Sequence, residues 1–405
     1  MMSYVMLLIL FFTSTTLEAV DLPSLVKRLD VSSTKTVGRI SRVHSFEGRY
    51  SDGYIYDNLA FPNKQKPIVN QQRILEILEY FDEKVIPSSL TKYLPDRVWD
   101  DSDNIVILFD NIHDNKYYKN SPDKDYPAFF SKEFSSIYRR HVIVVDINYI
   151  NDNRIKLLLS HELMHVFRYM YNPNEEPWVE EGLSKLTEYF IAGTDCILLD
   201  QYEKSSNLEL KYDYAFPGEQ HYAHNMLYML YLYKNFGGLS LIRKILSSES
   251  SGAKNINQAL LEMSATERNQ FKKDYYTFEK TFINFSLSLI LNQYQKIIES
   301  SGLLTLDEKL GNFSIMPETI DYQNHYKIYP WAVRIYLADS TCVELSVSHN
   351  KLVVVAMDIY NNDEKKTIRV IDSGDICFEK TKKQKQYIAI INPSDQSIKF
   401  QFNKK

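Results

Sequence analysis

The sequence HELMH, residues 161–165, constrains what this chain can fold into more than any other feature. On an α-helix, His161 and His165 lie one turn apart and project from one face, where two imidazoles can reach a single cation. Glu162 is rotated by about 100° around the same helix, so it lies beside the cation and can act as a base on a bound water. With nine histidines in 405 residues, this pattern would arise by chance about 0.01 times. The pattern therefore predicts a metal site on a helix.

The residues around HELMH predict that this helix is buried. Asn151 or Asp152 can cap it, and it is expected to continue to about Tyr171. Apolar side chains surround it on almost every face: Leu157, Leu158, Leu159, Leu163, Met164, Val166, Phe167 and Met170. A helix that is apolar all round is buried, and buried imidazoles and carboxylates without partners would strongly destabilise the fold. A bound metal is one such partner.

A second helix is expected close to the first. Pro177 suits its first turn, and Gly193 lies directly after its expected end. Its apolar stripe comprises Val179, Leu183, Leu186 and Phe190. The link NPNEE, residues 172–176, is short enough that the two helices should pack as neighbours. The second helix can therefore present a carboxylate to the histidine pair.

Three carboxylates of the second helix compete to be the third metal ligand. Glu181 and Glu188 lie within about 20° of one another on the side opposite the apolar stripe, whereas Glu180 lies closer to the stripe. Helix angles favour Glu181 or Glu188 and do not separate the two. Glu175, Glu176 and Glu180 are interpreted as acidic residues at a helix start, where they complement the helix dipole.

The sequences HELMH and PWVEEGLSKLTEY together resemble the gluzincin metallopeptidases of the peptidase MA clan. In that family the glutamate directly before glycine binds zinc, so the resemblance implies that Glu181 is the third ligand. HYAHNMLYMLYLYKNFGGLSLIRKIL, residues 221–246, resembles the helix and Phe-Gly-Gly turn of the hyicolysin-like family of secreted bacterial neutral metallopeptidases. The resemblance covers roughly residues 143–292 and, loosely, the β-rich end. Ala223 departs from it, because glycine is expected there.

The resemblance implies hydrolytic chemistry with Zn²⁺ as the cofactor. Two histidines and one glutamate leave the fourth tetrahedral position open, as in catalytic zinc sites. Glu162 is expected to take a proton from water and pass it to the leaving amine. Tyr222, His221 and His224 are candidates for stabilising the oxyanion, and Tyr222 is preferred because family members often use a tyrosine. Glu188 is a candidate for orienting the histidines, with an exposed helix charge as the alternative.

The fold class expected is α+β. Residues 1–19 are interpreted as a signal peptide and residues 20–65 as an N-terminal arm or propeptide. Residues 66–300 are expected to form a zincin-type metallopeptidase domain, with a mixed sheet and a helical subdomain. Short period-two segments with turn signals predict a C-terminal antiparallel β-sandwich over residues 325–405.

Three shorter segments of the expected catalytic domain also have clear periodicity. Residues 70–86 predict a helix, and residues 104–110 and 141–147 predict buried strands. The strand over residues 141–147 is a candidate edge for pairing with an extended peptide substrate.

Charge and hydropathy exclude several classes of partner. The net charge is −5 and the chain has no long basic block, so nucleic acid is not an expected partner. Residues 5–12 form an apolar run too short to span a bilayer and typical of a signal peptide. No later apolar run reaches 18 residues, so the mature protein is expected to be secreted, extracellular or periplasmic, without an integral membrane segment.

The three cysteines allow two interpretations. Cys342 and Cys377 lie in one strand-rich region and can pair in an exported protein. The alternative is three buried free thiols, including Cys196. Their spacing excludes a cysteine-based zinc site.

The function predicted is that of a secreted zinc endopeptidase acting on a protein or peptide substrate. One alternative is an aminopeptidase or other exopeptidase on the same fold, although no motif for holding a substrate terminus is evident. Another is an inactive zincin-like secreted binding protein, which the intact Glu162 disfavours. The sequence leaves peptide specificity and oligomeric state open.

Overall fold

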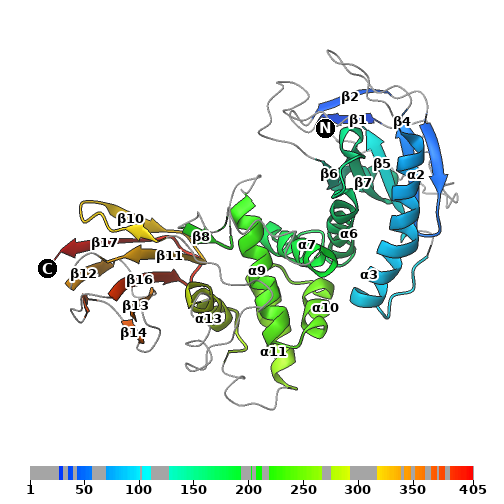
Figure 1. Ribbon diagram of the computed structural model, residues 1–405. Helices are drawn as coiled ribbons and strands as arrows, with labels where there is room; N and C mark the ends of the chain where they lie inside the picture. The colour runs from blue at the N-terminus through cyan, green and yellow to red at the C-terminus, as the bar shows by residue number, and fades with distance from the viewer. Residues whose placement is uncertain are drawn as a thin grey trace, which may run out of the picture. The chain divides into compact units, whose positions relative to one another are not determined.

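Figure 1 shows a computed structural model of the chain. It describes residues 27–30, 35–39, 43–56, 70–100, 103–110, 127–192, 202, 207–211, 219–266, 275–291, 317–338, 342–347, 352–360, 366–371, 374–378 and 384–404. The expected signal peptide, residues 1–19, and Cys196 lie outside the described residues.

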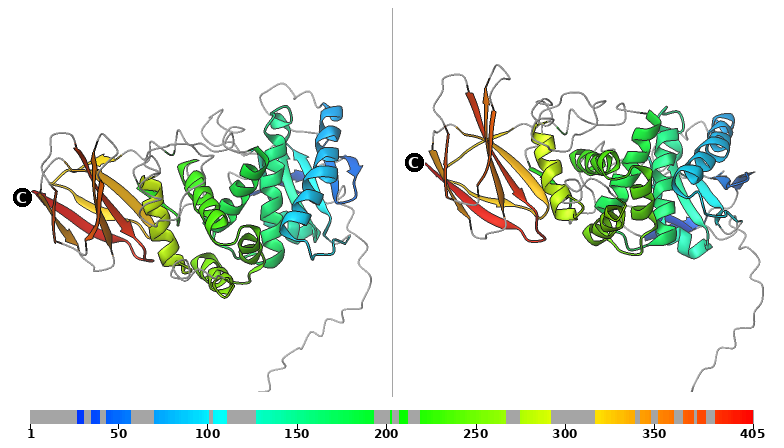
Figure 2. Two further views of the ribbon diagram at one scale, coloured as in Figure 1. Left: turned by 60° about the horizontal axis from the view of Figure 1, so that its bottom comes forward. Right: turned by 90° about the horizontal axis from the view of Figure 1, so that it is seen from below.

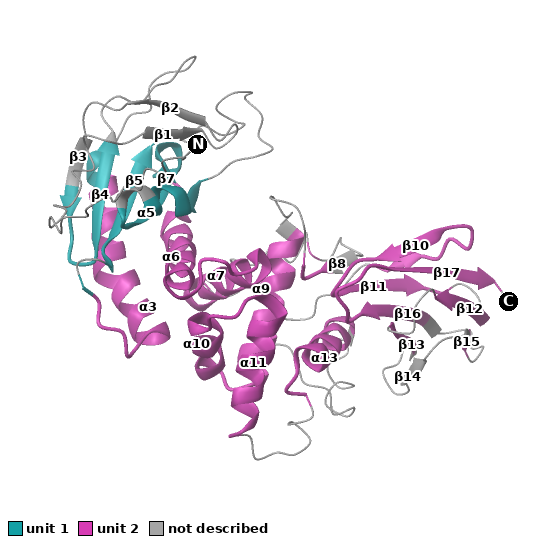
Figure 3. Cartoon of the chain, turned by 180° about the vertical axis from the view of Figure 1, so that it is seen from behind, with its two compact units in different colours: residues 1–72, 100–150 teal, residues 73–99, 151–405 magenta. Residues whose placement is uncertain are grey.

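The fold is α+β, as predicted, and the chain divides into two compact units (Figure 3). The first unit comprises Met1–Gln72 and Asp100–Ile150, and the second comprises Arg73–Trp99 and Asn151–Lys405. The mixed sheet belongs to the first unit, whereas the HELMH helix and the C-terminal strands belong to the second.

The first unit contains a mixed five-stranded sheet with the order β3-β4-β5-β7-β6. The strands are β3 (Val43–Glu47), β4 (Ser51–Tyr56), β5 (Ile105–Asp110), β6 (Ala128–Phe130) and β7 (His141–Asp146). β4, β5 and β7 run parallel, and β3 and β6 are antiparallel to their neighbours. Every residue of β5 is buried, which explains its continuous apolar run. The unit also contains the antiparallel pair β1 (Lys27–Asp30) and β2 (Lys35–Arg39), and helix α5 (Lys132–Tyr138).

The strand expected as a substrate-pairing edge is an interior strand. β7 pairs with β5 on one side and with β6 on the other. Its backbone hydrogen-bonding groups are therefore used within the sheet, and the expectation was wrong. Among the described strands, β6 occupies that edge.

The second unit begins with a longer helical segment than the sequence predicts. Helix α2 (Gln71–Tyr80) continues through a π-helical turn, η1 (Phe81–Val85), into α3 (Ile86–Tyr93). Pro87 lies at the start of α3, where a missing backbone N–H is tolerated. The helix therefore continues past residue 86, where the apolar periodicity suggested its end.

The remaining helices of the second unit pack against one another. They are α6 (Ile155–Tyr171), α7 (Pro177–Ala192), α9 (Glu219–Asn235), α10 (Leu239–Ser247), α11 (Gly252–Ser264) and α13 (Phe278–Leu291). α7 packs against both α6 and α9 (Figure 1). The predicted pair of neighbouring helices is therefore confirmed.

The C-terminal part of the second unit, residues 317–404, is called the β region here. Its strands are β9 (Glu318–Thr319), β10 (His325–Ile328), β11 (Ala332–Leu337), β12 (Cys342–Val347), β13 (Val353–Tyr360), β14 (Lys366–Ile371), β15 (Gly374–Cys377), β16 (Gln384–Asn392) and β17 (Ile398–Lys404). They form two sheets at the C-terminal end of the chain (Figure 2). One sheet has the order β10-β17-β12-β15, and the second has the order β14-β13-β16-β11-β8, in which β9 pairs parallel to β11. β8 (Asn207–Glu209) enters the second sheet from outside the β region.

The two sheets of the β region share one hydrophobic core. Tyr326 and Phe400 of the first sheet lie in the same buried cluster as Tyr336 and Ile390 of the second. The rings of Tyr326 and Phe400 are stacked with centroids 5.4 Å apart. The period-two pattern of the sequence therefore marks the inward-facing positions of both sheets.

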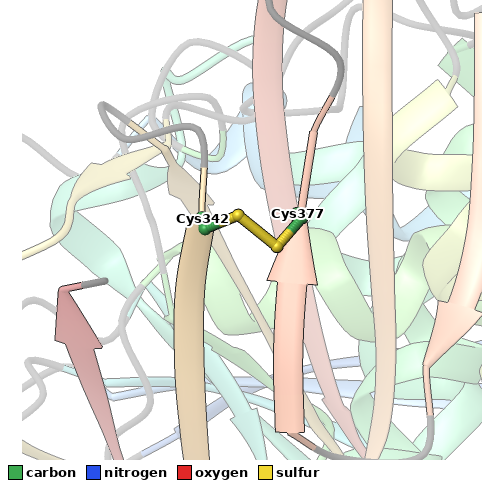
Figure 4. Close-up of a disulfide and its surroundings, with 2 residues drawn as sticks. All are labelled: Cys342 and Cys377. Atoms are coloured by element: carbon green, nitrogen blue, oxygen red, sulfur yellow. A yellow bond between two sulfur atoms is a disulfide. The ribbon is translucent and has the colours of Figure 1, made fainter.

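Cys342 and Cys377 form a disulfide (Figure 4). They lie directly opposite one another in the antiparallel register of β12 and β15, with Cα atoms 4.1 Å apart. The predicted pairing is confirmed, and the alternative of three free thiols is excluded. Among the described residues, no helix is long and apolar enough to cross a membrane.

Candidate metal site

Helix α6 places the HELMH residues on a buried part of the bundle. It begins at Ile155, with Arg154 as the N-cap residue and no side-chain capping hydrogen bond, so the expectation that Asn151 or Asp152 caps the helix was wrong. Asp152 accepts a hydrogen bond from the backbone N–H of Arg154 itself, at 2.8 Å. The helix is 17 residues long, and His161 and Glu162 are 9% and 6% exposed. Burial, predicted from the apolar surroundings, is confirmed for these two side chains, whereas His165 is only partly buried.

Helix α7 approaches α9 closely at Gly182, the residue after Glu181. A Cβ atom at Gly182 would lie 2.8 Å from the Cγ of Met229 and 3.1 Å from the backbone oxygen of Asn225. Glycine is therefore the residue that lets α7 lie this close to α9. This contact fixes the position of the neighbouring Glu181 relative to the bundle.

Three side chains converge on one point between α6 and α7. The Nε2 atoms of His161 and His165 are 3.2 Å apart. Glu181 places Oε2 at 3.2 Å from the Nε2 of His161 and Oε1 at 3.7 Å from the Nε2 of His165. Within the described part of the chain, this triad is the one group of histidine, cysteine and carboxylate side chains whose ligand atoms cluster closely enough for a metal ion.

These separations fit a tetrahedral zinc ion. Zinc bonds to imidazole nitrogen and carboxylate oxygen are about 2.0–2.2 Å long, so ligand atoms at tetrahedral angles lie about 3.3–3.6 Å apart. The two imidazole nitrogens are 3.2 Å apart, and the Glu181 oxygens nearest to them, Oε2 and Oε1, lie at 3.2 and 3.7 Å. With one ligand atom from each residue the three atoms lie within 4.8 Å of one another, so the donor set is compatible with a zinc ion.

The other two candidate carboxylates face the opposite sides of the imidazole rings. Glu188 lies with Oε1 at 2.7 Å from the Nδ1 of His161, and Glu180 lies with Oε2 at 3.9 Å from the Nδ1 of His165. Glu188 is 4% exposed, so it is not the exposed helix charge of the alternative interpretation. The predicted contact between Glu188 and a histidine of the site is present.

The carboxylates around His161 also set its protonation in the metal-free protein. Burial alone would lower the pKa of His161, but hydrogen bonds with Glu181 and Glu188 outweigh burial and raise the pKa to about 10. The same contacts lower the pKa values of Glu181 and Glu188 against the opposing effect of burial. The two carboxylates thus favour a positive charge at His161 in the metal-free protein.

Lys185 adds a positive charge beside the site that sequence reasoning missed. Its Nζ lies 2.8 Å from Glu188 Oε1, the same oxygen that contacts His161. Its Nζ also lies 5.9 Å from the ring centroid of Tyr222 on α9. The spacing of Lys185 and Glu188, three residues apart on a helix, was the signal that could have identified this pair.

The three candidate oxyanion residues have different surroundings on α9. Tyr222 is partly buried and is joined to the site through Lys185 and Glu188. His224 is fully buried, and its Nδ1 lies 2.9 Å from the hydroxyl of Tyr202. The Nδ1 of His221 lies 3.5 Å from the backbone oxygen of Glu209. The surroundings of His224 and His221 are those of packed side chains.

The assignment of Glu175 as simple helix-start charge was wrong. Its carboxylate and the guanidinium of Arg168 form an ion pair at 2.7 Å, and both side chains are fully buried. Glu175 also accepts hydrogen bonds from the backbone N–H of Gly252 and from the side chain of Asn255. A buried arginine in an otherwise apolar helix was the available signal that such a partner exists.

Comparison of the sequence with protein-family models and with curated proteins finds no match.

Proposed function

We propose that this chain is a zinc-dependent endopeptidase of the gluzincin type. The observation that supports it most strongly is the convergence of His161, His165 and Glu181 on one point, with Glu162 on the intervening turn. Two imidazoles and one carboxylate are a ligand set that leaves the fourth tetrahedral position of zinc open for catalysis. When bound, zinc would polarise a substrate carbonyl and lower the pKa of a water to about 7.

The side chains around the ligands supply the remaining functions. Glu162 takes a proton from the attacking water and returns it to the leaving amine of the cleaved peptide bond. Glu188 accepts a hydrogen bond from Nδ1 of His161 and so holds Nε2 toward the cation. Tyr222 is the proposed donor to the oxyanion, and its position beside Lys185 supports a role close to the site.

The architecture proposed is a zincin-type catalytic domain followed by an antiparallel β-sandwich. The mixed five-stranded sheet and the α6–α7 pair support the first part, and the shared core of the two C-terminal sheets supports the second. We propose export of the protein, on the basis of the apolar run at residues 5–12 and the disulfide between Cys342 and Cys377.

The endopeptidase assignment is tested with peptides whose two ends are chemically blocked. A fluorogenic peptide with acetylated and amidated ends should be cleaved internally, and a chelator of divalent cations should abolish the cleavage. Restoration by Zn²⁺ at about one equivalent is expected. Cleavage confined to peptides with a free terminus would favour an exopeptidase, and absence of cleavage with zinc bound would favour a binding protein.

A further inference from the structure

The acidic pair Glu175 and Glu176, at the end of the interhelical link (residues 172–176), contacts two different parts of the second unit. Glu175 belongs to the buried network of Arg168 described above. Glu176 Oε2 accepts a hydrogen bond from the indole N–H of Trp178 at 2.7 Å and lies 3.5 Å from the Nζ of Lys211. Glu176 directly precedes α7 and is five residues before Glu181. The contacts that hold Glu176 in place therefore also affect the position of Glu181, the proposed metal ligand.

Lys211 connects Glu176 to the β region. Its Nζ lies 2.9 Å from Oδ1 of Asp395, in the turn between β16 and β17. The same Oδ1 accepts a hydrogen bond from the indole N–H of Trp331 at 2.8 Å. Lys211 thus joins two carboxylates, Glu176 and Asp395, and each of them accepts a hydrogen bond from a tryptophan indole. We call these three charged residues the Lys211 bridge.

The two tryptophans also contact one buried ring. The ring centroid of Phe278 on α13 lies 5.7 Å from that of Trp178 and 4.4 Å from that of Trp331. All three side chains are buried, with Trp178 2% exposed. Ring pairs at this separation stabilise beyond their buried area, so Phe278 of α13 joins α7 to the β region.

Backbone hydrogen bonds also join β8 and Leu210 to the β region. Residues 207–209 of β8 pair with residues 332–334 of β11, and the N–H of Leu210 donates to the backbone oxygen of Trp331 at 3.0 Å. The backbone oxygen of Glu209 in turn lies 3.5 Å from the Nδ1 of His221, at the start of α9. The β region is therefore joined to the first turns of α7 and α9 through residues outside it, namely Lys211, Phe278 and Glu209. These two helices carry Glu181 and Tyr222.

We infer that the β region is a positioning element of the metal site, acting through the Lys211 bridge and the Trp178–Phe278–Trp331 packing on the start of α7. Glu181 is the ligand affected, since it lies on the second turn of α7 whereas both histidines lie on α6. Lys211 is a positioning residue and does not touch the cation. The inference rests on the proposed metal site.

The expected effect on zinc affinity can be judged from the solvent exposure of the side chains in the Lys211 bridge. The side chains of Lys211, Glu176 and Asp395 are 24%, 37% and 70% exposed, and ion pairs this accessible to water are weak. We therefore expect Lys211→Met to weaken zinc binding about two- to five-fold. The buried contact should contribute more, so the double variant Lys211→Met with Trp331→Phe, which also loses the indole donor to Asp395, should weaken it about ten-fold or more.

The test measures the zinc dissociation constant of full-length variants by competition with a chromophoric chelator, together with hydrogen exchange over residues 174–184 in the metal-free protein. Lys244→Met is the matched control, because its ion pair with Glu262 is also exposed but lies between α10 and α11. Lys211→Arg keeps the positive charge and should retain most of the zinc affinity of the wild type. Weaker zinc binding with faster exchange at the start of α7, absent from the control, is the expected result.

Two other outcomes are distinguishable. If Lys211→Met and the double variant lower the unfolding temperature but leave zinc affinity and local exchange unchanged, the β region only stabilises the fold and the inference is wrong. If the wild type binds no zinc, the proposed function fails, and the exchange measurement alone still decides whether the β region holds the start of α7.

Discussion

The Nδ1 atom of His161 lies 2.7 Å from Oε1 of Glu188, while its Nε2 atom lies 3.2 Å from Oε2 of Glu181. The two nitrogens of one ring thus face two different carboxylates. Glu181 belongs to the triad of converging ligand atoms, and the proposed role of Glu188 is to hold the orientation of the ring. Each carboxylate can be tested separately because removing one leaves the other nitrogen of the ring in contact.

Replacing Glu188 by alanine should weaken metal binding without abolishing it. Loss of a carboxylate that orients a ligating histidine typically costs about 10- to 100-fold in metal affinity. Glu188→Gln should lose less, because the amide oxygen can still accept the hydrogen bond from Nδ1. The measurement is the zinc dissociation constant of the purified variants. Equal affinity in wild type and Glu188→Ala would show that the contact with His161 has no role in holding the ring.

The two adjacent glutamates of α7 should behave differently on removal. Glu181→Ala should lose stoichiometric zinc, because it removes one of three ligands. Glu180→Ala should keep about one zinc per chain, since Oε2 of Glu180 faces the Nδ1 of His165 and lies 3.9 Å from it. Metal analysis after gel filtration distinguishes the two. Zinc retained by Glu181→Ala and lost from Glu180→Ala would reverse the ligand assignment.

Gly182→Ala should disturb both stability and the metal site. The added Cβ would meet Met229 at 2.8 Å and the backbone oxygen of Asn225 at 3.1 Å, and overpacking of this kind costs about 1–3 kcal/mol. Because α7 must shift next to Glu181, zinc affinity should fall together with the free energy of unfolding. The double variant with Met229→Ala should recover part of both losses. A fully stable Gly182→Ala protein with native zinc affinity would contradict the close approach of α7 and α9.

His224 should make the protein sensitive to acid. Burial, with a smaller contribution from the charge of His221, lowers the pKa of His224 to about 3, from 6.5 in the unfolded chain. Between these values the unfolded state binds the additional proton, so the free energy of unfolding should fall by about 1.4 kcal/mol for each pH unit below 6.5. Above pH 6.5 the group has no effect.

The pH effect is isolated by comparing urea unfolding of wild type and His224→Phe at pH 7 and pH 5. Between pH 7 and pH 5, the free energy of unfolding should fall by about 2 kcal/mol less in His224→Phe than in the wild type. His325→Phe, at an exposed position of β10, is the control and should follow the wild type. The same loss in all three proteins would show that His224 does not titrate as its burial requires.

Much of the second unit could be predicted from local sequence signals. The α6–α7 pair follows from apolar periodicity, Pro177 and the short link, all of which act within one or two helical turns. The choice between Glu181 and Glu188 could not be made in that way, since both carboxylates lie on the same side of the helix. The assignment depends on which nitrogen of His161 each carboxylate contacts. The packing of α7 against α6 and α9 determines these contacts.

Other features depend on contacts between distant residues. Arg168 donates to the backbone oxygens of Leu246, Ser248 and Ser250, far along the chain. The local sequence could indicate that Arg168 has a buried partner, but it could not identify these distant members of the network. The interior position of β7 depends on β6, which precedes it in sequence but joins the sheet on the other side from β5. Periodicity identifies a strand but does not identify its neighbours.

The most direct test of the zinc hydrolase account compares wild type with Glu162→Gln for zinc content and for cleavage of casein. Glu162 follows His161 in the sequence and does not belong to the triad of converging ligand atoms, so both proteins should contain about one zinc per chain. Cleavage should occur in the wild type and be lost in the variant, because glutamine cannot accept the proton of the attacking water. Equal cleavage by the two proteins, or a wild type that binds no zinc, would contradict the account.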